Sequence, residues 1–105
     1  MIIYEVTVHV LSEVYDKYIG WLKPHIEEML VFNGFKRALL LKEQGDQRAP
    51  EGSQELIVQY YVESMEHLTD YLNNYAQSMR NDAIQRFPEQ FKISRRTFEI
   101  QKDTA

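Results

Sequence analysis

The first eleven residues of the chain alternate between two faces, which is the pattern of a β-strand. One face is apolar and consists of Ile2, Tyr4, Val6, Val8 and Val10. The other begins with Ile3 and continues with Glu5, Thr7 and His9. A period of two with many β-branched residues predicts a strand from Ile2 to Leu11. The polar stripe has three interpretations: a hydrogen-bonded network at a subunit interface, the lining of a barrel cavity, or a wet edge strand.

A helical repeat follows this strand. The positions that recur at helical spacing are Val14, Tyr18, Trp21, Leu22, His25 and Met29. They predict a helix that begins after an N-cap at Ser12 and continues to about Phe32. Asn33-Gly34 is expected to end it, because both residues tolerate positive φ. Pro24 lies inside the helix and predicts a kink, since it lacks an N–H group.

The rest of the chain adds two strands, a helix and a last strand. The predicted segments are the strands Phe35–Lys42 and Glu55–Val62, a helix from the N-cap Ser64 to Phe87, and the strand Phe91–Ile100. The apolar stripe of this second helix is expected to include Leu68, Leu72, Tyr75, Ala76 and Met79. The polar segment Glu43–Ser53 predicts a mobile hairpin loop whose role stays open. The run Leu56-Ile57-Val58 predicts a central strand that is buried on both faces.

The order of these elements, β-α-β-β-α-β, predicts a ferredoxin-like α+β fold. Two helices should cover one face of a four-stranded antiparallel sheet, in a single domain of residues 1–100 with a disordered tail at 101–105. The opposite face would expose Ile3 and Ile57. A second copy covering that face is the economical solution, which predicts a homodimer with a dimeric α+β barrel core.

Composition excludes several classes of function. With 12 basic and 16 acidic side chains the net charge is −4, which argues against nucleic-acid and anionic-membrane partners. The absence of cysteine removes disulfides, thiolate nucleophiles and Cys-type metal sites, and it suits a cytoplasmic location. No apolar run approaches the ~20 residues of a membrane helix. The N-terminal segment is expected to be a strand, not a signal peptide.

Three segments together resemble one small bacterial family. They are Met-Ile-Ile-Tyr-Glu-Val-Thr-Val at the start, Trp-Leu-Lys-Pro-His-Ile at 21–26 and Val-Gln-Tyr-Tyr-Val-Glu-Ser at 58–64. The chain resembles the domain-of-unknown-function family numbered 4286 from about Ile2 to Ile100. The resemblance implies a dimeric α+β barrel, in a superfamily that includes cofactor-free monooxygenases, haem-degrading enzymes, lactone isomerases and polyketide cyclases. It implies no catalytic residue.

His25 is the strongest candidate for chemistry. It shares one helix face with Tyr18 and Trp21, and this face should point toward the sheet. A histidine there could act as a general base near neutral pH, with Trp21 and Tyr75 lining a ligand pocket. The alternative is a core histidine that donates to a backbone carbonyl, such as one freed by Pro24.

Polar residues on the strands supply further candidates for ligand binding. Gln59 and Tyr61 share one face of their strand and could bind a ligand or bond across a dimer seam. Arg95 and Arg96 must face opposite sides of the sheet. With Arg37 they could hold a carboxylate, or they could pair with acidic residues on neighbouring strands. Of these three arginines, Arg96 is the one that we expect to bind the ligand.

Other sites are not indicated. His9, His25 and His67 lie on three different predicted elements, so no metal site is expected. No glycine-rich phosphate loop is present, and no cofactor is expected. Two hypotheses remain. The first is a small-molecule-binding dimer with a closed pocket, a possible cofactor-independent oxygenase, isomerase or cyclase. The second is a non-enzymatic dimeric module that binds or regulates a protein, with a filled core.

Overall fold

A computed structural model describes residues 1–45 and 48–105 of the chain. The strands are β1 (Ile2–Leu11), β2 (Phe35–Leu41), β3 (Ser53–Val62) and β4 (Phe91–Glu99). The helices are α1 (Tyr15–Met29), α2 (Met65–Asn74) and α3 (Ala76–Arg86), and a short 3₁₀ turn, Ser12–Val14, precedes α1. The strands form one antiparallel sheet in the order β2-β3-β1-β4. The predicted ferredoxin-like α+β fold is therefore confirmed.

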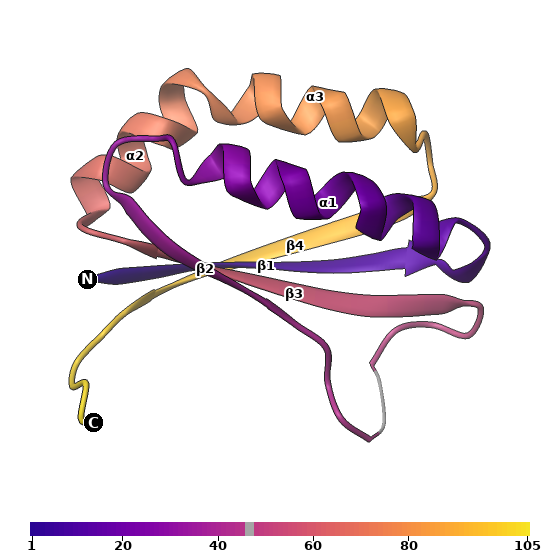
Figure 1. Cartoon of the computed structure of the whole chain (residues 1–105), viewed down its shortest axis with the longest axis horizontal. Coiled ribbons are helices and arrows are strands. Elements are labelled where there is room, and N and C mark those ends of the chain that lie inside the picture. Colours follow the sequence, from indigo (N-terminus) through magenta and orange to yellow (C-terminus); the bar gives the residue numbers. More distant parts are fainter. Residues whose placement is uncertain (46–47) are drawn as a thin grey trace.

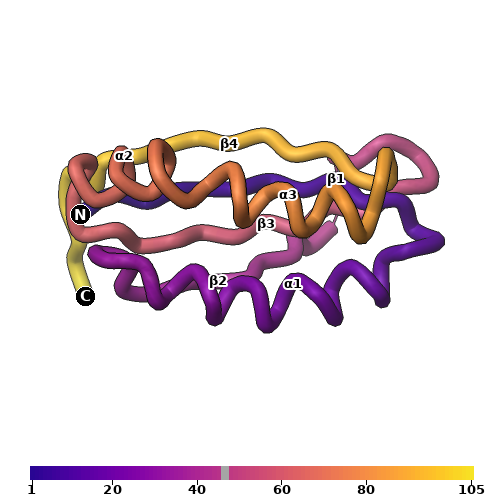
Figure 2. The backbone as a smooth tube through the Cα atoms, turned by 90° about the horizontal axis from the view of Figure 1, so that it is seen from above, coloured from indigo at the N-terminus to yellow at the C-terminus, as the bar shows by residue number. Residues whose placement is uncertain are grey.

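All three helices cover the same face of the sheet (Figure 1). Seen from above, α1 runs along the β2 edge, and α2 and α3 run above the central strands (Figure 2). The core lies between these two layers. It includes the predicted apolar face of β1, together with Leu56, Val58, Tyr60 and Val62 from β3. Strand β3 is central, as the Leu56-Ile57-Val58 run predicted. It is not buried on both faces, because Ile57 lies on the sheet face without helices and is only half-buried.

The start of α1 differs from its prediction. Ser12 opens the 3₁₀ turn, and its side chain makes no capping bond. Helix α1 begins at Tyr15, and its N-cap Val14 makes no side-chain capping bond either. The helix contains Pro24 and buries Tyr18, Leu22 and Met29 on its predicted apolar face. It ends three residues before the expected Phe32, and Gly34 has the predicted positive φ, +85°.

The second predicted helix is divided in two. Ser64 caps α2 as predicted, by accepting from the His67 backbone N–H. At Tyr75 the backbone leaves helical geometry and α3 begins. Asn74 explains part of this break, because its side-chain amide donates to the Asp70 carbonyl at 3.0 Å and competes with the helical bond to that group. The predicted stripe through Leu72 and Tyr75 is therefore wrong.

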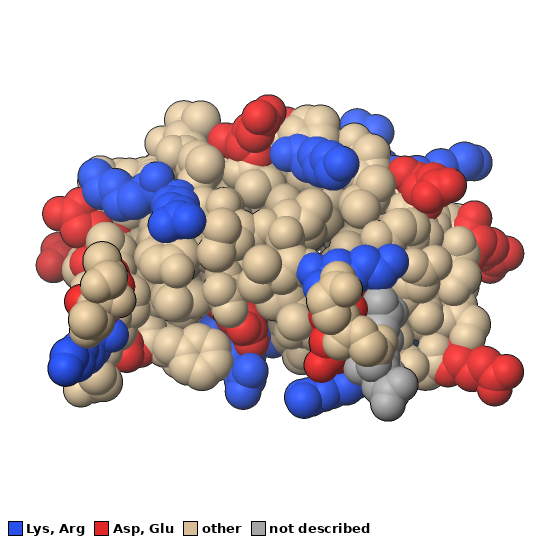
Figure 3. All heavy atoms as spheres, turned by 60° about the horizontal axis from the view of Figure 1, so that its bottom comes forward, with Lys and Arg blue, Asp and Glu red and all other residues tan. Residues whose placement is uncertain are grey.

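The sheet face away from the helices is uncovered in the single chain (Figure 3). Uncharged side chains occupy the middle of this face, and most charged groups lie toward its edges (Figure 3). One row across it joins Arg37, Tyr61, Ile3 and Phe98. The next row contains a polar network: the 7% exposed Glu5 accepts from Gln59 at 2.9 Å and from Arg96 at 3.0 and 3.2 Å. Within the polar stripe of β1, Glu5 thus forms part-buried hydrogen bonds on this face.

Two remaining segments bear on the sequence predictions. The predicted loop Glu43–Ser53 includes Asp46 and Gln47, which lie outside the described residues. Residues 101–105 are exposed and have no helix or strand. Within the described part of the chain, no helix is long and apolar enough to cross a membrane.

Candidate functional site

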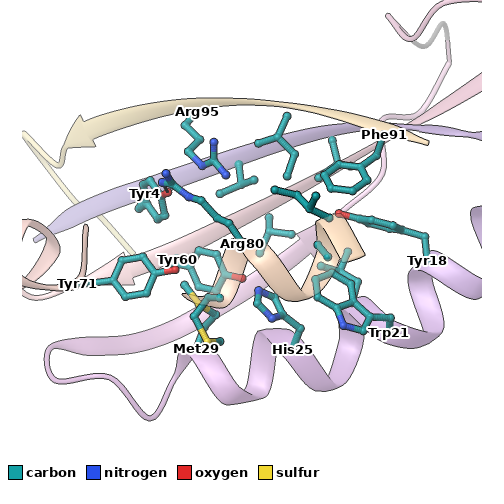
Figure 4. Close-up of a pocket in the computed structure, with 18 residues that line it drawn as sticks. Tyr4, Tyr18, Trp21, His25, Met29, Tyr60, Tyr71, Arg80, Phe91 and Arg95 are labelled. Carbon is teal, nitrogen blue, oxygen red and sulfur yellow. Dashed lines mark hydrogen bonds between the residues drawn. The ribbon is translucent and has the colours of Figure 1, made fainter. Parts of the chain in front are cut away.

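A cavity of about 260 Å³ lies between the helices and the sheet. Helices α1 and α3 contribute Trp21, His25, Met29, Arg80 and Ala83, among others, and the strands contribute Tyr4, Val58, Tyr60, Phe91 and Arg95. Figure 4 shows these side chains converging from the two layers. The hypothesis of a small-molecule site predicted a closed pocket. This cavity reaches the surface instead, because the exposed residues Ile84 and Arg95 line it.

His25 extends from α1 into this cavity (Figure 4). Its ring stacks on the Trp21 indole, with centroids 4.6 Å apart and an interplanar angle of 21°. Burial lowers the pKa of His25, and the nearby carboxylates of Glu28 and Asp82 oppose this effect. A lowered pKa favours the neutral imidazole at pH 7, the form that accepts a proton. No group in residues 1–45 or 48–105 forms a hydrogen bond with the ring.

Trp21 is held in place from the opposite helix. Its Nε1–H donates to the Asp82 carboxylate on α3 at 2.8 Å. Asp82 also accepts from Arg86 at 3.0 Å. These two hydrogen bonds lower the pKa of Asp82, so this carboxylate stays ionised and keeps accepting both of them. The indole therefore has two fixed contacts: its N–H donates to Asp82 of α3, and its ring stacks on His25.

Tyrosine hydroxyls are the main polar groups of the cavity. Tyr4, Tyr18, Tyr60 and Tyr71 all contribute to the lining. Burial raises the pKa of Tyr18 and of Tyr60 well above the ordinary value, and it raises the pKa of Tyr71 to about 12. These hydroxyls therefore stay protonated near neutral pH and can donate hydrogen bonds to a ligand.

Two arginines bring positive charge to the cavity. Arg80 of α3 is half-buried and donates to the Tyr4 hydroxyl at 3.3 Å. Arg95 of β4 pairs with Val6 across the sheet, so it faces the helices. Figure 4 shows both guanidinium groups turned toward the same part of the cavity, beside Tyr4.

The structure brings only some of the predicted site residues together. Trp21 and His25 share the cavity. Gln59, Tyr61 and Arg96 lie on the opposite sheet face, where Gln59 and Arg96 bond to Glu5. Tyr75, expected beside His25, is 47% exposed; it lines a separate hollow with Phe32 and Tyr71. These four residues do not contribute to the site around His25.

Sequence reasoning did not select Tyr4, Tyr60 or Arg80 for the site. The alternation in β1 places Tyr4 on the apolar face, and this face lines the cavity, so the sequence does carry a signal for Tyr4. Arg80 lies after the break between α2 and α3. In the uninterrupted helix that the sequence predicts, the Arg80 side chain would point in another direction. Within residues 1–45 and 48–105, no three His, Cys, Asp or Glu side chains are grouped so that they could hold a metal ion.

The sequence matches one family profile over almost its full length. The match to the domain of unknown function DUF4286 covers residues 1–101. The chain belongs to this family. No curated protein matches the chain.

Solved structures with the same fold include enzymes of several kinds. SnoaB from Streptomyces nogalater, a cofactor-independent oxygenase, has a TM-score of 0.70 at 10% identity over 97% of this chain and 95% of its own. The haem-degrader MhuD from Mycobacterium tuberculosis, with two haems in its active site, has a TM-score of 0.70 at 17% identity over the whole of both chains. A dimeric ferredoxin-like protein from an uncultured marine organism has a TM-score of 0.68 at 6% identity over 98% of both. At these identities the likeness establishes the shared fold.

Proposed function

We propose that this DUF4286 chain is a homodimer that binds a small organic molecule in the cavity beside His25 and acts as a cofactor-independent oxygenase. The observation that carries the proposal is a single site that combines a cavity of about 260 Å³ with a histidine whose pKa is lowered by burial. Ligand sites are typically concave, largely apolar and supplied with a few polar groups. The alternative, a non-enzymatic module, predicted a filled core.

His25 is the general base in this proposal. It takes a proton from an acidic C–H or O–H group of the substrate, and the resulting anion transfers electrons to molecular oxygen. When a CH₂ group becomes a carbonyl, one O₂ is consumed and one water is released, so the substrate supplies all the electrons. The protonated tyrosines stabilise the anion. The oxygenase is preferred to an isomerase or a cyclase because the fold is shared with SnoaB.

Oxygen uptake without any added cofactor tests this function. A panel of anthrone compounds, which carry such a CH₂ group, is incubated with the protein, and O₂ is followed with an electrode. His25→Ala should lower the rate by about 10²- to 10⁴-fold, the usual contribution of a general base. His9→Gln is the control, because His9 lies on the other sheet face and contacts Glu55. Turnover that survives His25→Ala would remove His25 from the mechanism.

A cavity-filling variant separates binding from chemistry. Ala83 on α3 is buried and lines the cavity, so Ala83→Leu should occupy part of its volume. We expect the variant to fold and to lose the shift in melting temperature that binding compounds give to the wild type. An unchanged shift would place the bound compound elsewhere on the protein.

A further inference from the structure

Two arginines at the cavity have no acidic partner among the residues that the structure describes. In the described part of the chain, no Asp or Glu oxygen lies within 4 Å of Arg80 or Arg95. Arg86 and Arg96, in contrast, pair with Asp82 and Glu5. Most Lys and Arg residues in the described part of the chain also lack an ion pair, but Arg80 and Arg95 are the two arginines that line this cavity. The cavity therefore carries positive charge that an anionic ligand could pair with.

The two guanidinium groups act on the same side of the cavity. Both lower the pKa of Tyr71, against the larger effect of burial, so both lie within electrostatic reach of its hydroxyl. Figure 4 shows Arg80 from α3 and Arg95 from β4 with their guanidinium groups directed toward the same part of the cavity. The two positive charges repel each other, and an anion bound between them would be attracted to both.

The remaining walls suit a flat apolar body. Aliphatic and aromatic side chains from both layers form them, including Leu22, Met29, Val58, Phe91 and Ile93. Trp21 and Tyr18 add aromatic surfaces, with ring centroids 5.6 Å apart. His25 enters from α1, on the other side of the cavity from Arg95 (Figure 4). A ligand anchored at the arginines would thus present its opposite end to His25.

We infer that the ligand is an aromatic carboxylate whose carboxylate group is held by Arg80 and Arg95. A guanidinium matches the planar carboxylate with two parallel N–H donors, and a pair of arginines gives the anion charge-assisted bonds from two directions. The inference rests on the proposed function for the location of the site, and it adds the chemical class of the ligand and the residues that select it.

Calorimetric titration with matched acids and alcohols tests the class of ligand. The probes are 2-naphthoate and 2-naphthalenemethanol, followed by the corresponding one-ring and three-ring pairs. Within a binding pair, the acid should bind about tenfold more tightly than the alcohol, because a charge-assisted hydrogen bond contributes about this factor or more. The preference should shrink at high salt.

Variants of the two arginines assign the preference to them. Arg80→Gln and Arg95→Gln should each weaken acid binding about tenfold and leave alcohol binding nearly unchanged. Lys36→Gln removes one positive charge from an exposed pair with Glu63 and is the matched control. Acid binding that is unaffected by both arginine variants would overturn the inference.

The outcomes separate this inference from the proposed function. If acids and alcohols bind equally, and Ala83→Leu abolishes both, then the cavity is a ligand site and the inference of a carboxylate is wrong. If no member of the panel binds, the proposed small-molecule function fails, and the ligand class fails with it. A preference for acids that is lost in the arginine variants supports both.

Discussion

Trp21 and Asp82 join the two helices that flank the cavity, through a hydrogen bond of 2.8 Å from the indole N–H to the carboxylate. The residues are 61 positions apart in the sequence, so this bond is purely tertiary. Because the indole also stacks on His25, the bond fixes the position of the proposed base indirectly. Asp82 is therefore a positioning residue, since it acts through Trp21.

The coupling of Trp21 and Asp82 can be measured. Asp82→Ala should destabilise the fold by about 1 kcal/mol, a typical value for one hydrogen bond, and should shift the fluorescence of the single tryptophan. With Trp21→Phe in a double-mutant cycle, urea unfolding should give a non-additive loss. Asp70→Ala is the control, because Asp70 accepts only a local bond from Asn74. Additive losses would show that the bond contributes nothing.

The lowered pKa of His25 predicts a dependence of stability on pH. Its ordinary value is about 6.5, so the unfolded chain binds the proton more tightly than the folded protein does. The associated stability is present above about pH 6.5 and is lost as the pH falls through the lowered pKa. His25→Asn removes this effect. The free energy of unfolding, measured with urea at constant protein concentration, should therefore fall more steeply with decreasing pH for the wild type than for His25→Asn. Parallel plots of this free energy against pH would contradict the lowered pKa.

The hydrogen bonds of Glu5 on the open sheet face predict that Arg96→Met destabilises the protein more than the loss of an exposed ion pair does. Arg96→Met leaves the buried Glu5 carboxylate with the Gln59 amide alone, and it should destabilise the protein by about 1–2 kcal/mol. This loss lies around the low end of the range for hydrogen bonds to charged groups, because the Arg96 side chain is 71% exposed and solvent screens its charge. Lys36→Met breaks an exposed pair and should cost under about 0.5 kcal/mol. Equal losses in urea unfolding would refute the distinction.

Gly34 is expected to be intolerant of a side chain. Its φ is +85°, and a Cβ atom would collide with the ring of His67, which also contacts the N-cap Ser64. Gly52 has a φ of +83° with open space around it, so Gly52→Ala measures the backbone cost alone, about 1 kcal/mol. Gly34→Ala should cost at least about 1 kcal/mol more, because the contact must be relieved. Similar midpoints of thermal unfolding would disprove the collision.

The open sheet face predicts the homodimer. Tyr61 of β3, Ile3 of β1 and Phe98 of β4 lie side by side on this face, and a second copy would cover them. Sedimentation equilibrium of the wild type should give the mass of two chains, and Ile3→Lys should give one. Val31→Lys, at an 84% exposed position outside the sheet, should leave the mass unchanged. A monomeric wild type would remove the barrel from the proposal.

The order of elements and the inward face of β1 could be predicted from the sequence. The reason is local: alternation at Ile2–Val10 and helical spacing at Tyr18–Met29 each depend on neighbouring residues only. The pairing of Trp21 with His25 followed from the same rule, because the two are four residues apart on one helix. Ser64 was also predictable, since an N-cap serves the backbone of its own helix.

Tertiary structure alone decided which polar residues meet. Arg80 reaches the cavity because α3 begins after the break at Tyr75 and packs over the sheet. Arg95 faces the helices because the β1–β4 register places it opposite Val6. The same parity sends Arg96 to Glu5, on the other face. Strand registers and the packing of helices on the sheet are set by contacts between segments far apart in the chain, and periodicity within one segment carries no information about them.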